Sequence, residues 1–240
     1  MTRSLLVRGM LVGLLAGLLA FVFARWAGEP EVERAIAFET SIDRAAGKPP
    51  EPEMVSRIVQ KSLGLLTGVA VYGTAAGGLF GLVFAFAYGR VEIHRPRTLS
   101  AVLAALGFVA IVLVPTLKYP ANPPSVGSPD TIGVRTTAFF LLLLCSVAAM
   151  VLALQVRRRL SNRFGGWNGS LLAAALFLLI VAIVSHFLPV IDEVPAGFPA
   201  TLMWRFRVAS LGIQAVMWAT LGLLFGWLTE RDGKWQQLHT

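Results

Sequence analysis

Long apolar stretches alternate with short polar segments along the chain. Six stretches of about 19 to 26 mostly apolar residues can be distinguished, and an α-helix of about 20 residues crosses a hydrocarbon layer ~30 Å thick. Backbone polar groups inside lipid must bond within their own segment, which favours helices. We therefore predict an all-α membrane protein, a bundle of six transmembrane helices, with these approximate spans: Leu5–Ala24, Leu63–Tyr88, Leu99–Leu117, Thr136–Gln155, Ser170–Ile191 and Val208–Leu228.

Composition supports this class. Of the 240 residues, 56% are hydrophobic and 14% are charged, which is typical of a membrane protein. The spans leave no room for a soluble domain, so residues 1–240 are predicted to form a single integral membrane domain. The first span resembles a secretory signal, but Arg25 and Trp26 stand where a cleavage site needs small residues. We expect an uncleaved first helix.

Charged residues predict the orientation of the helices. If the N-terminus is cytoplasmic, the inner segments hold 11 basic and 3 acidic residues, and they carry the whole net charge of +8. This is the positive-inside distribution. We predict cytoplasmic N and C termini and three outward-facing helical hairpins. The basic runs RVEIHRPR and QVRRRLSNR are expected to be short loops between spans rather than contacts to nucleic acid.

Glycines repeat every fourth residue in the first two spans. Such a repeat clears one helix face so that a neighbouring backbone can approach closely. We predict that these two spans face each other or a partner protein. The repeating residues are Gly9, Gly13 and Gly17 in the first span and Gly73, Gly77 and Gly81 in the second, with a shorter pair, Gly222 and Gly226, in the sixth.

The first outer segment, Arg25–Lys61, contains a predicted amphipathic helix. Pro30 suits the first turn of a helix, and apolar residues follow it at near-helical spacing, so we expect a periplasmic amphipathic segment over about residues 29–61. Glu29, Glu33 and Glu39 lie near its beginning. These carboxylates either form a solvated face at the positive end of the helix dipole, or gather a divalent cation at the mouth of the bundle.

The second and third outer segments, Val114–Thr137 and Leu188–Arg207, are rich in proline. Proline lacks a backbone N–H and fixes φ, so the prolines from Pro115 to Pro129 are expected to exclude a regular helix and hold an extended path. The similar spacing of proline and charged residues suggests diverged copies. We predict a shallow outer vestibule in which basic residues pair with some acids. Its residues are Lys118, Tyr119, Asn122, Arg135, Trp204 and Arg205.

Several long strings carry a family resemblance. GEPEVERAIAFE, KYPANPPSVGSPDTIGVRT, EVPAGFPATLMWRFRVASLG and LLTGVAVYGTAAGGLFGL are similar to the predicted cobalt transporter subunit family CbtA, and the similarity runs over nearly the whole chain. The resemblance implies a bacterial inner-membrane protein in cobalt uptake linked to cobalamin synthesis. It also implies a small single-span partner, CbtB, with a histidine-rich segment, and Co²⁺ as the transported ion rather than a tightly bound cofactor.

The histidines limit what metal chemistry the chain can supply. Co²⁺ binds well to imidazole and accepts carboxylate oxygen, but only three histidines are present. His94 is expected in an inner loop and His239 at the C-terminus, both solvated. His186 alone lies in a span. No histidine pair has i, i+4 spacing, so we expect weak capture of a hydrated ion by outer groups and delivery to the partner. The predicted metal contacts are Glu29, Glu33, Glu39, Asp130, His186, Asp192 and Glu193.

Other functions stay open. The same acids are compatible with a subunit that never touches metal, such as a non-transporting membrane scaffold or assembly subunit that uses the glycine faces. A membrane-embedded lipid-processing enzyme is less favoured, because the sequence contains no GxxxxGK[ST] loop, nucleophile elbow or HExxH motif. Ser185, His186 and Asp192 are only neighbours in sequence, without the context of a catalytic triad. We do not expect an enzyme.

Overall fold

The computed structural model describes residues 2–47 and 54–232. Every regular element in these residues is a helix, which confirms the all-α prediction. Residues 48–53 of the predicted outer segment and the C-terminal His239 lie outside the described residues.

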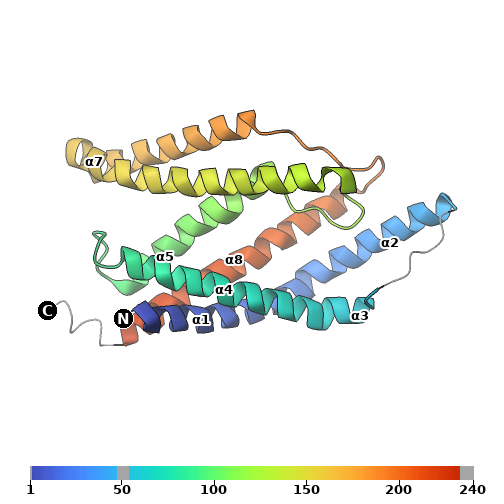
Figure 1. The fold of residues 1–240 in the computed structure, drawn as a ribbon, viewed down its shortest axis with the longest axis horizontal. Coiled ribbons are helices and arrows are strands. Elements are labelled where there is room, and N and C mark those ends of the chain that lie inside the picture. The colour runs from blue at the N-terminus through green and yellow to red at the C-terminus, as the bar shows by residue number, and fades with distance from the viewer. Residues whose placement is uncertain (1, 48–53, 233–240) are drawn as a thin grey trace. The chain divides into compact units, whose positions relative to one another are not determined.

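Short π-helical turns join several α-helices into longer continuous ones (Figure 1). In the described part of the chain, five helices, three of them joined across π-helical turns, are long and apolar enough to cross a membrane. This confirms a multi-pass membrane protein. The elements are α1 (Thr2–Phe23), η1 (Ala24–Gly28), α2 (Glu29–Ala45), α3 (Arg57–Val59), η2 (Gln60–Gly64), α4 (Leu65–Ala87), α5 (Pro96–Gly107), η3 (Phe108–Leu113), α6 (Val114–Lys118), η4 (Pro129–Thr131), α7 (Ile132–Phe187) and α8 (Ala200–Arg231).

The fourth predicted span falls within α7, and the fifth lies in α7 as far as Phe187. This element has 56 residues and contains one non-helical residue, Gly165, with φ 82° and ψ 159°. Glycine adopts positive φ without a steric penalty, and Figure 1 shows the two arms of α7 running back along each other. The predicted loop QVRRRLSNR, residues 155–163, is helical instead. Arginine, glutamine and leucine are good helix formers, so the first arm continues to the glycine.

Pro115 lies inside a helix, so the prediction that this proline excludes a regular helix is wrong. It occupies the first turn of α6, directly after the π-helical η3. Pro115 lies inside the continuous helix Pro96–Lys118, and the wide π-helical turn before it makes room for the proline ring. Residues 119–128 do lack a helix, as predicted. The outer path is therefore without helix only over residues 119–128, with a turn at residues 124–125, and Pro129 begins the short helix η4.

The first helix is much longer than its predicted span. Thr2–Ala45 forms 44 continuous helical residues, or about 66 Å at 1.5 Å per residue. That is about twice the thickness of a hydrocarbon layer. Pro30 lies in the first turn of α2, and η1 carries the helix past it. The predicted amphipathic helix is thus an extension of the first span.

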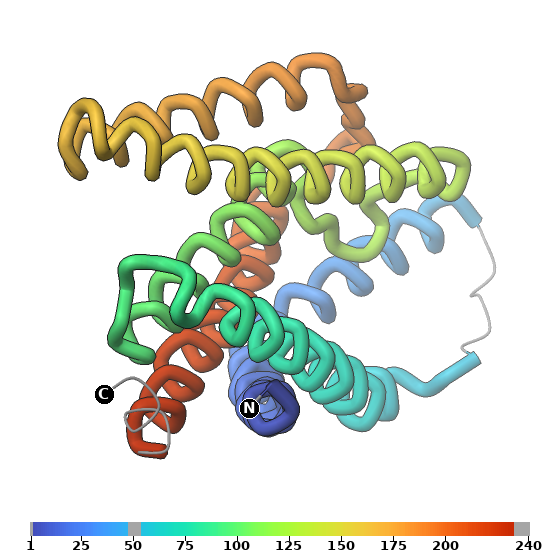
Figure 2. The backbone as a smooth tube through the Cα atoms, turned by 60° about the vertical axis from the view of Figure 1, so that its left-hand side comes forward, coloured from blue at the N-terminus to red at the C-terminus, as the bar shows by residue number. Residues whose placement is uncertain are grey.

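The chain divides into two compact units. Unit 1 comprises Met1–Ala105, Pro123–Ser125 and Phe198–Thr240, and unit 2 comprises Leu106–Asn122 and Val126–Gly197. In unit 1, α1 lies beside α4 (Figures 1 and 2) and also contacts α8. Its buried core contains Leu5, Phe84 and Phe225, none of which is exposed.

Glycines bring α1 and α4 together in unit 1. A Cβ added at Gly9 would lie 2.1 Å from the carbonyl oxygen of Gly77, and one at Gly13 would lie 2.0 Å from that of Gly73. These distances are shorter than any real Cβ contact, so the two backbones touch directly. Gly17 and Gly81 continue the interface at the two ends. Close backbone approach of this kind supplies the van der Waals contact that holds helices together in lipid.

A second close approach joins α5 to α8. A Cβ at Gly222 would lie 2.5 Å from the Cβ of Ala104, and one at Gly226 would lie 2.8 Å from that of Ser100. Ser100, which is completely buried, donates a hydrogen bond from Oγ to the Gly222 carbonyl oxygen at 2.7 Å. Small residues and one interhelical hydrogen bond therefore fix this pair.

Unit 2 is built around the two arms of α7. Leu142 and Ala149 of the first arm belong to one buried cluster with Ala173 and Phe177 of the second arm. Near the turn at Gly165, a Cβ added at Gly169 would lie 2.6 Å from the backbone nitrogen of Ser161, so the arms are also in backbone contact there. The hairpin is thus packed along its length.

Candidate functional site

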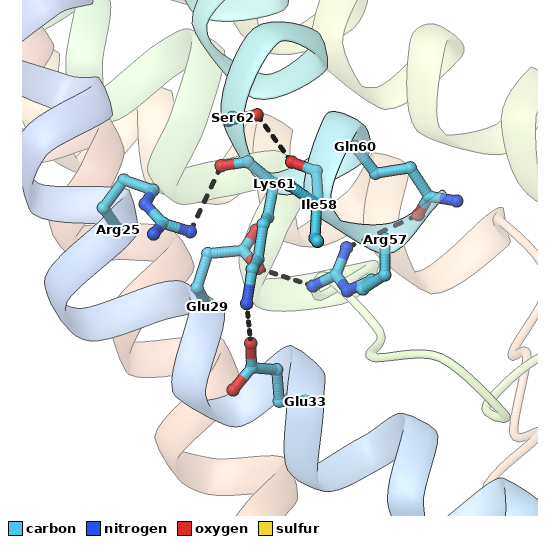
Figure 3. Close-up of polar contacts among 8 residues, drawn as sticks. All are labelled: Arg25, Glu29, Glu33, Arg57, Ile58, Gln60, Lys61 and Ser62. Carbon is cyan, nitrogen blue, oxygen red and sulfur yellow. Dashed lines mark hydrogen bonds and ion pairs between the residues drawn. The ribbon is translucent and has the colours of Figure 1, made fainter. Parts of the chain in front are cut away.

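Two ion pairs join the beginning of α2 to the helix that leads into α4 (Figure 3). Arg57 Nη2 donates to Glu29 Oε2 at 2.5 Å. One turn further along each helix, Lys61 Nζ donates to Glu33 Oε1 at 2.7 Å. Arg25 Nη1 adds a hydrogen bond to the Lys61 carbonyl oxygen at 3.3 Å. The two helices run antiparallel, as the Gly9–Gly77 and Gly13–Gly73 contacts show, so the two ion pairs cross between facing helices. We call this set of contacts the ladder.

The ladder favours the charged form of the Glu33 carboxylate. The hydrogen bond from Lys61 and the positive charge of Lys61 lower the pKa of Glu33 below its usual 4.5; burial opposes this shift, and the charges of Arg57 and Arg25 add to it. A metal ion arriving at Glu33 would have to displace a resident ammonium group. Glu29 and Glu33 are therefore engaged in joining the two helices.

Glu31, which sequence reasoning did not single out, is the buried acid of α2. Its side chain is 10% exposed and accepts a hydrogen bond from Arg34 Nη1 at 2.5 Å. Its other oxygen, Oε2, is buried without a hydrogen-bond partner in the described part of the chain. The spacing of Ala24, Glu31 and Ala35, all buried, follows the helical period. That period could have identified Glu31 as an inward-facing acid.

Glu193 connects the second and third outer segments within unit 2. Its side chain is 9% exposed and accepts hydrogen bonds from Ser128 N at 3.2 Å, Arg135 Nη1 at 2.7 Å and the Thr131 hydroxyl. The Thr131 hydrogen bond, followed by the contacts with Ser128 and Arg135, lowers the pKa of Glu193, and burial opposes the shift. A side chain at Gly127 would meet Arg135 Nη1 at 2.6 Å, so this glycine leaves room for the guanidinium. We call Glu193 and its three donors the Glu193 clasp.

Tyr119 makes a second link between the same outer segments. This buried tyrosine donates from its hydroxyl to the Pro189 carbonyl oxygen at 2.8 Å. Lys118 Nζ lies 5.9 Å from the centre of the Tyr119 ring, within range of a cation–π contact. Prolines in both segments restrict the backbone, and these contacts tie the restricted backbones together.

The other predicted metal contacts are more accessible. Asp130, His186 and Asp192 are exposed, whereas Glu39 is half-buried and has a polar or electrostatic partner. Within residues 2–47 and 54–232, no group of three or more histidine, cysteine or acidic side chains is placed to hold a metal ion. The assignment of these residues to metal stays a prediction.

The remaining vestibule residues are divided between the units. Arg135 and Asn122 belong to unit 2, and Asn122 is half-buried with a partner of its own. Trp204 and Arg205 belong to unit 1, on the first turns of α8, where both are exposed. The described outer residues thus include paired acids that fix the segments and exposed groups that a solute can reach.

Comparison with known proteins gives one match. Residues 2–230 of the 240-residue chain match the family model CbtA, described as "Probable cobalt transporter subunit (CbtA)". No curated protein and no solved structure matches the chain. The matched range includes all of unit 2, most of unit 1, the ladder, the Glu193 clasp and all of the exposed outer groups named above.

Proposed function

We propose that this chain, which belongs to the CbtA family, is the membrane subunit of a cobalt uptake transporter and acts with a small, histidine-rich, single-span partner subunit. The observation that carries the proposal is the family match over residues 2–230. Five long apolar helices in the described residues agree with a role in the membrane. No P-loop occurs in the sequence, so the driving force comes from an ion gradient or from another subunit.

The chain crosses the bacterial inner membrane six times, as three outward-facing hairpins with cytoplasmic termini. The reversal of α7 at Gly165 supports counting its two arms separately. The concentration of positive charge on one side supports the orientation.

Thiol labelling tests this arrangement. Cys145 is the only cysteine, so Cys145→Ala provides a cysteine-free background. In intact cells, a membrane-impermeant maleimide should label Ala196→Cys in the third outer segment and leave Asn162→Cys beside the Gly165 turn unlabelled until the cells are opened. Both replaced residues are exposed. The opposite labelling pattern would overturn the orientation.

Hydrated Co²⁺ first meets the exposed groups Asp130, His186 and Asp192. Their exposure supports this role, and carboxylate and imidazole are suitable ligands for the ion. Glu29, Glu33 and Glu193 instead maintain the shape of the outer segments, because basic side chains already occupy them. Weak binding of the ion at several successive side chains suits a transport pathway, because a transported ion must also be released.

Radioactive cobalt uptake tests the function directly. A strain without other cobalt uptake should accumulate Co²⁺ when it produces both subunits, and should gain little from the partner alone. No gain with both subunits would contradict the transport function. A non-transporting scaffold predicts instead a stable complex whose activity survives neutralisation of the exposed acids.

Side-chain variants test the entry route. The triple variant Asp130→Asn, His186→Asn, Asp192→Asn should lower uptake at limiting cobalt and recover at high cobalt, because only capture is weakened. Glu92→Gln, which neutralises an exposed acid on the predicted inner side, is the matched control and should leave uptake unchanged. Equal uptake by the triple variant and the parent would remove these residues from the route.

A further inference from the structure

A groove opens in unit 1 where the beginning of α1 meets the end of α8. Its volume is about 640 Å³, within the range of small-molecule sites. Its lining residues are Arg3, Ser4, Val7, Arg8, Leu11, Val12 and Leu228. Figures 1 and 2 show the start of α1 beside the last turns of α8. None of these residues belongs to the outer segments on which the proposed entry route depends.

On α1, the groove carries its two arginines at positions 3 and 8 and only apolar residues beyond Arg8. Positions 3, 7 and 11 follow one another by single turns on one face of α1, so about 12 Å separates Arg3 from Leu11. Leu11 is 64% exposed and Val7 is 47% exposed, and both belong to the predicted first span. The basic end therefore lies near the headgroup level of the bilayer, and the apolar end lies against the acyl chains.

The Arg8 guanidinium has a donor that no acceptor in the described residues uses. Its Nη2 donates to Asp232 Oδ2 at 2.5 Å. Its Nη1 is buried and has no hydrogen-bond partner in the described part of the chain. A guanidinium presents several donors in a planar fork that suits phosphate oxygens. Arg3 is exposed and forms no ion pair within the described residues. Two arginines and one aspartate leave the groove with an excess positive charge.

We propose that this groove binds an anionic phospholipid, with the headgroup phosphate on Arg3 and Arg8 and an acyl chain along Leu11 and Leu228. Charge complementarity selects the anionic headgroup. The apolar continuation selects a lipid over free phosphate, because a soluble anion would leave that part of the groove unfilled. The bound lipid bridges α1 and α8 beside the Arg8–Asp232 ion pair, and it stabilises the helix ends at this membrane surface.

Native mass spectrometry of the purified protein in a neutral detergent tests the site. The protein should retain phosphatidylglycerol in preference to phosphatidylcholine, and glycerol 3-phosphate should not compete at equal concentration. Arg3→Gln and Arg8→Gln should each weaken retention about fivefold, as expected for one basic side chain near a membrane surface. Asp232→Asn should retain the lipid at least as well as the parent, because it removes a negative charge and frees Arg8. Leu11→Gln should weaken retention without changing the preference for the headgroup.

Arg159→Gln provides the matched control. Arg159 is also exposed and lies in another predicted inner segment, so its loss should leave retention unchanged. Arg3→Gln should leave the fold intact, because the Arg3 side chain makes no ion pair with the described residues. A loss of lipid from this variant therefore reports on binding. Equal retention of both lipids, or equal losses in Arg159→Gln and Arg3→Gln, would overturn the proposal and assign the groove to another occupant, such as a partner helix.

Discussion

The α1–α4 interface and the Glu193 clasp hold their parts of the molecule together in opposite ways. Between α1 and α4, side chains are absent and backbones meet, with the Gly13 and Gly77 positions too close to admit even a methyl group. At the clasp, one carboxylate collects donors from Ser128, Thr131 and Arg135. The difference follows from the surroundings predicted for each region. Inside lipid, helices associate through close packing because burial of apolar surface gives no gain, whereas proline-rich segments near water need specific polar contacts.

The comparison predicts that substitutions destabilise the protein more at the glycine interface than at the clasp. Gly77→Ala should destabilise the protein by about 3 kcal/mol or more, because the new Cβ would lie 2.1 Å from the Gly9 carbonyl oxygen and the helices must separate. Thermal unfolding in detergent measures the loss. Gly68→Ala on the same helix is the matched control, since nothing lies within 4 Å of a Cβ there. Equal unfolding temperatures for the two variants would contradict backbone contact.

Charge reversal tests whether ion pairs have a comparable role in the first outer segment. Glu29→Arg should cost about 2 kcal/mol, because it places two arginines together where a partly buried pair stood. The double variant Glu29→Arg, Arg57→Glu should recover most of the loss. Thermal unfolding of both single variants and the double variant gives the coupling. A double variant no more stable than Glu29→Arg would show that charge pairing does not hold the ladder.

Acid should weaken the clasp and leave the glycine interface unchanged. The pKa of Glu193 is lowered in the folded protein, so its stabilisation is complete above the usual carboxyl pKa of 4.5 and is lost as pH falls through the folded value. The difference in unfolding temperature between the parent and Glu193→Gln should therefore be positive at pH 7 and shrink below pH 4.5. A difference that does not vary with pH would contradict a charged clasp.

The smallest effect concerns a single polar contact between packed helices. Ser100→Ala removes the hydrogen bond to Gly222 and should cost about 0.6 kcal/mol, the average for such contacts in membrane helices. Ser146→Ala is the control, because Ser146 is also buried but its Oγ has no hydrogen-bond partner in the described part of the chain. If Ser100→Ala lowered the free energy of unfolding as much as Gly77→Ala, close packing would not be the stronger of the two kinds of contact.

Long apolar stretches and repeated glycines indicated much of the fold, because lipid restricts the chain to helices with few packing solutions. The all-helical class and the family are confirmed, and the structure places the glycines of α1 and α4 face to face. The π-helical turns were not predicted, since no residue pattern uniquely specifies them. Pro115 misled the prediction because a proline in a first turn and a proline that breaks a helix look alike in sequence.

The outer acids were harder to assign. Glu29 and Glu33 were predicted to lie near the beginning of a helix, but their partners Arg57 and Lys61 come from another helix, and no local pattern identifies such a pair. Glu193 likewise takes its donors from residues about 60 positions away in sequence. Which acids are occupied and which are accessible therefore depends on tertiary contacts.

The π-helical turn η1 makes the first helix tolerant of a change in length. A wide turn accommodates one more residue than an α-helical turn, so deleting a residue from Ala24–Gly28 leaves the faces of α2 in nearly the same direction, although Pro30 loses the room that the wide turn provides. The same deletion inside α2 would rotate everything beyond it by about 100° and turn Glu33 away from Lys61. Insertions and deletions accumulated over evolution should therefore be found at this turn rather than in α1 or α2 on either side of it.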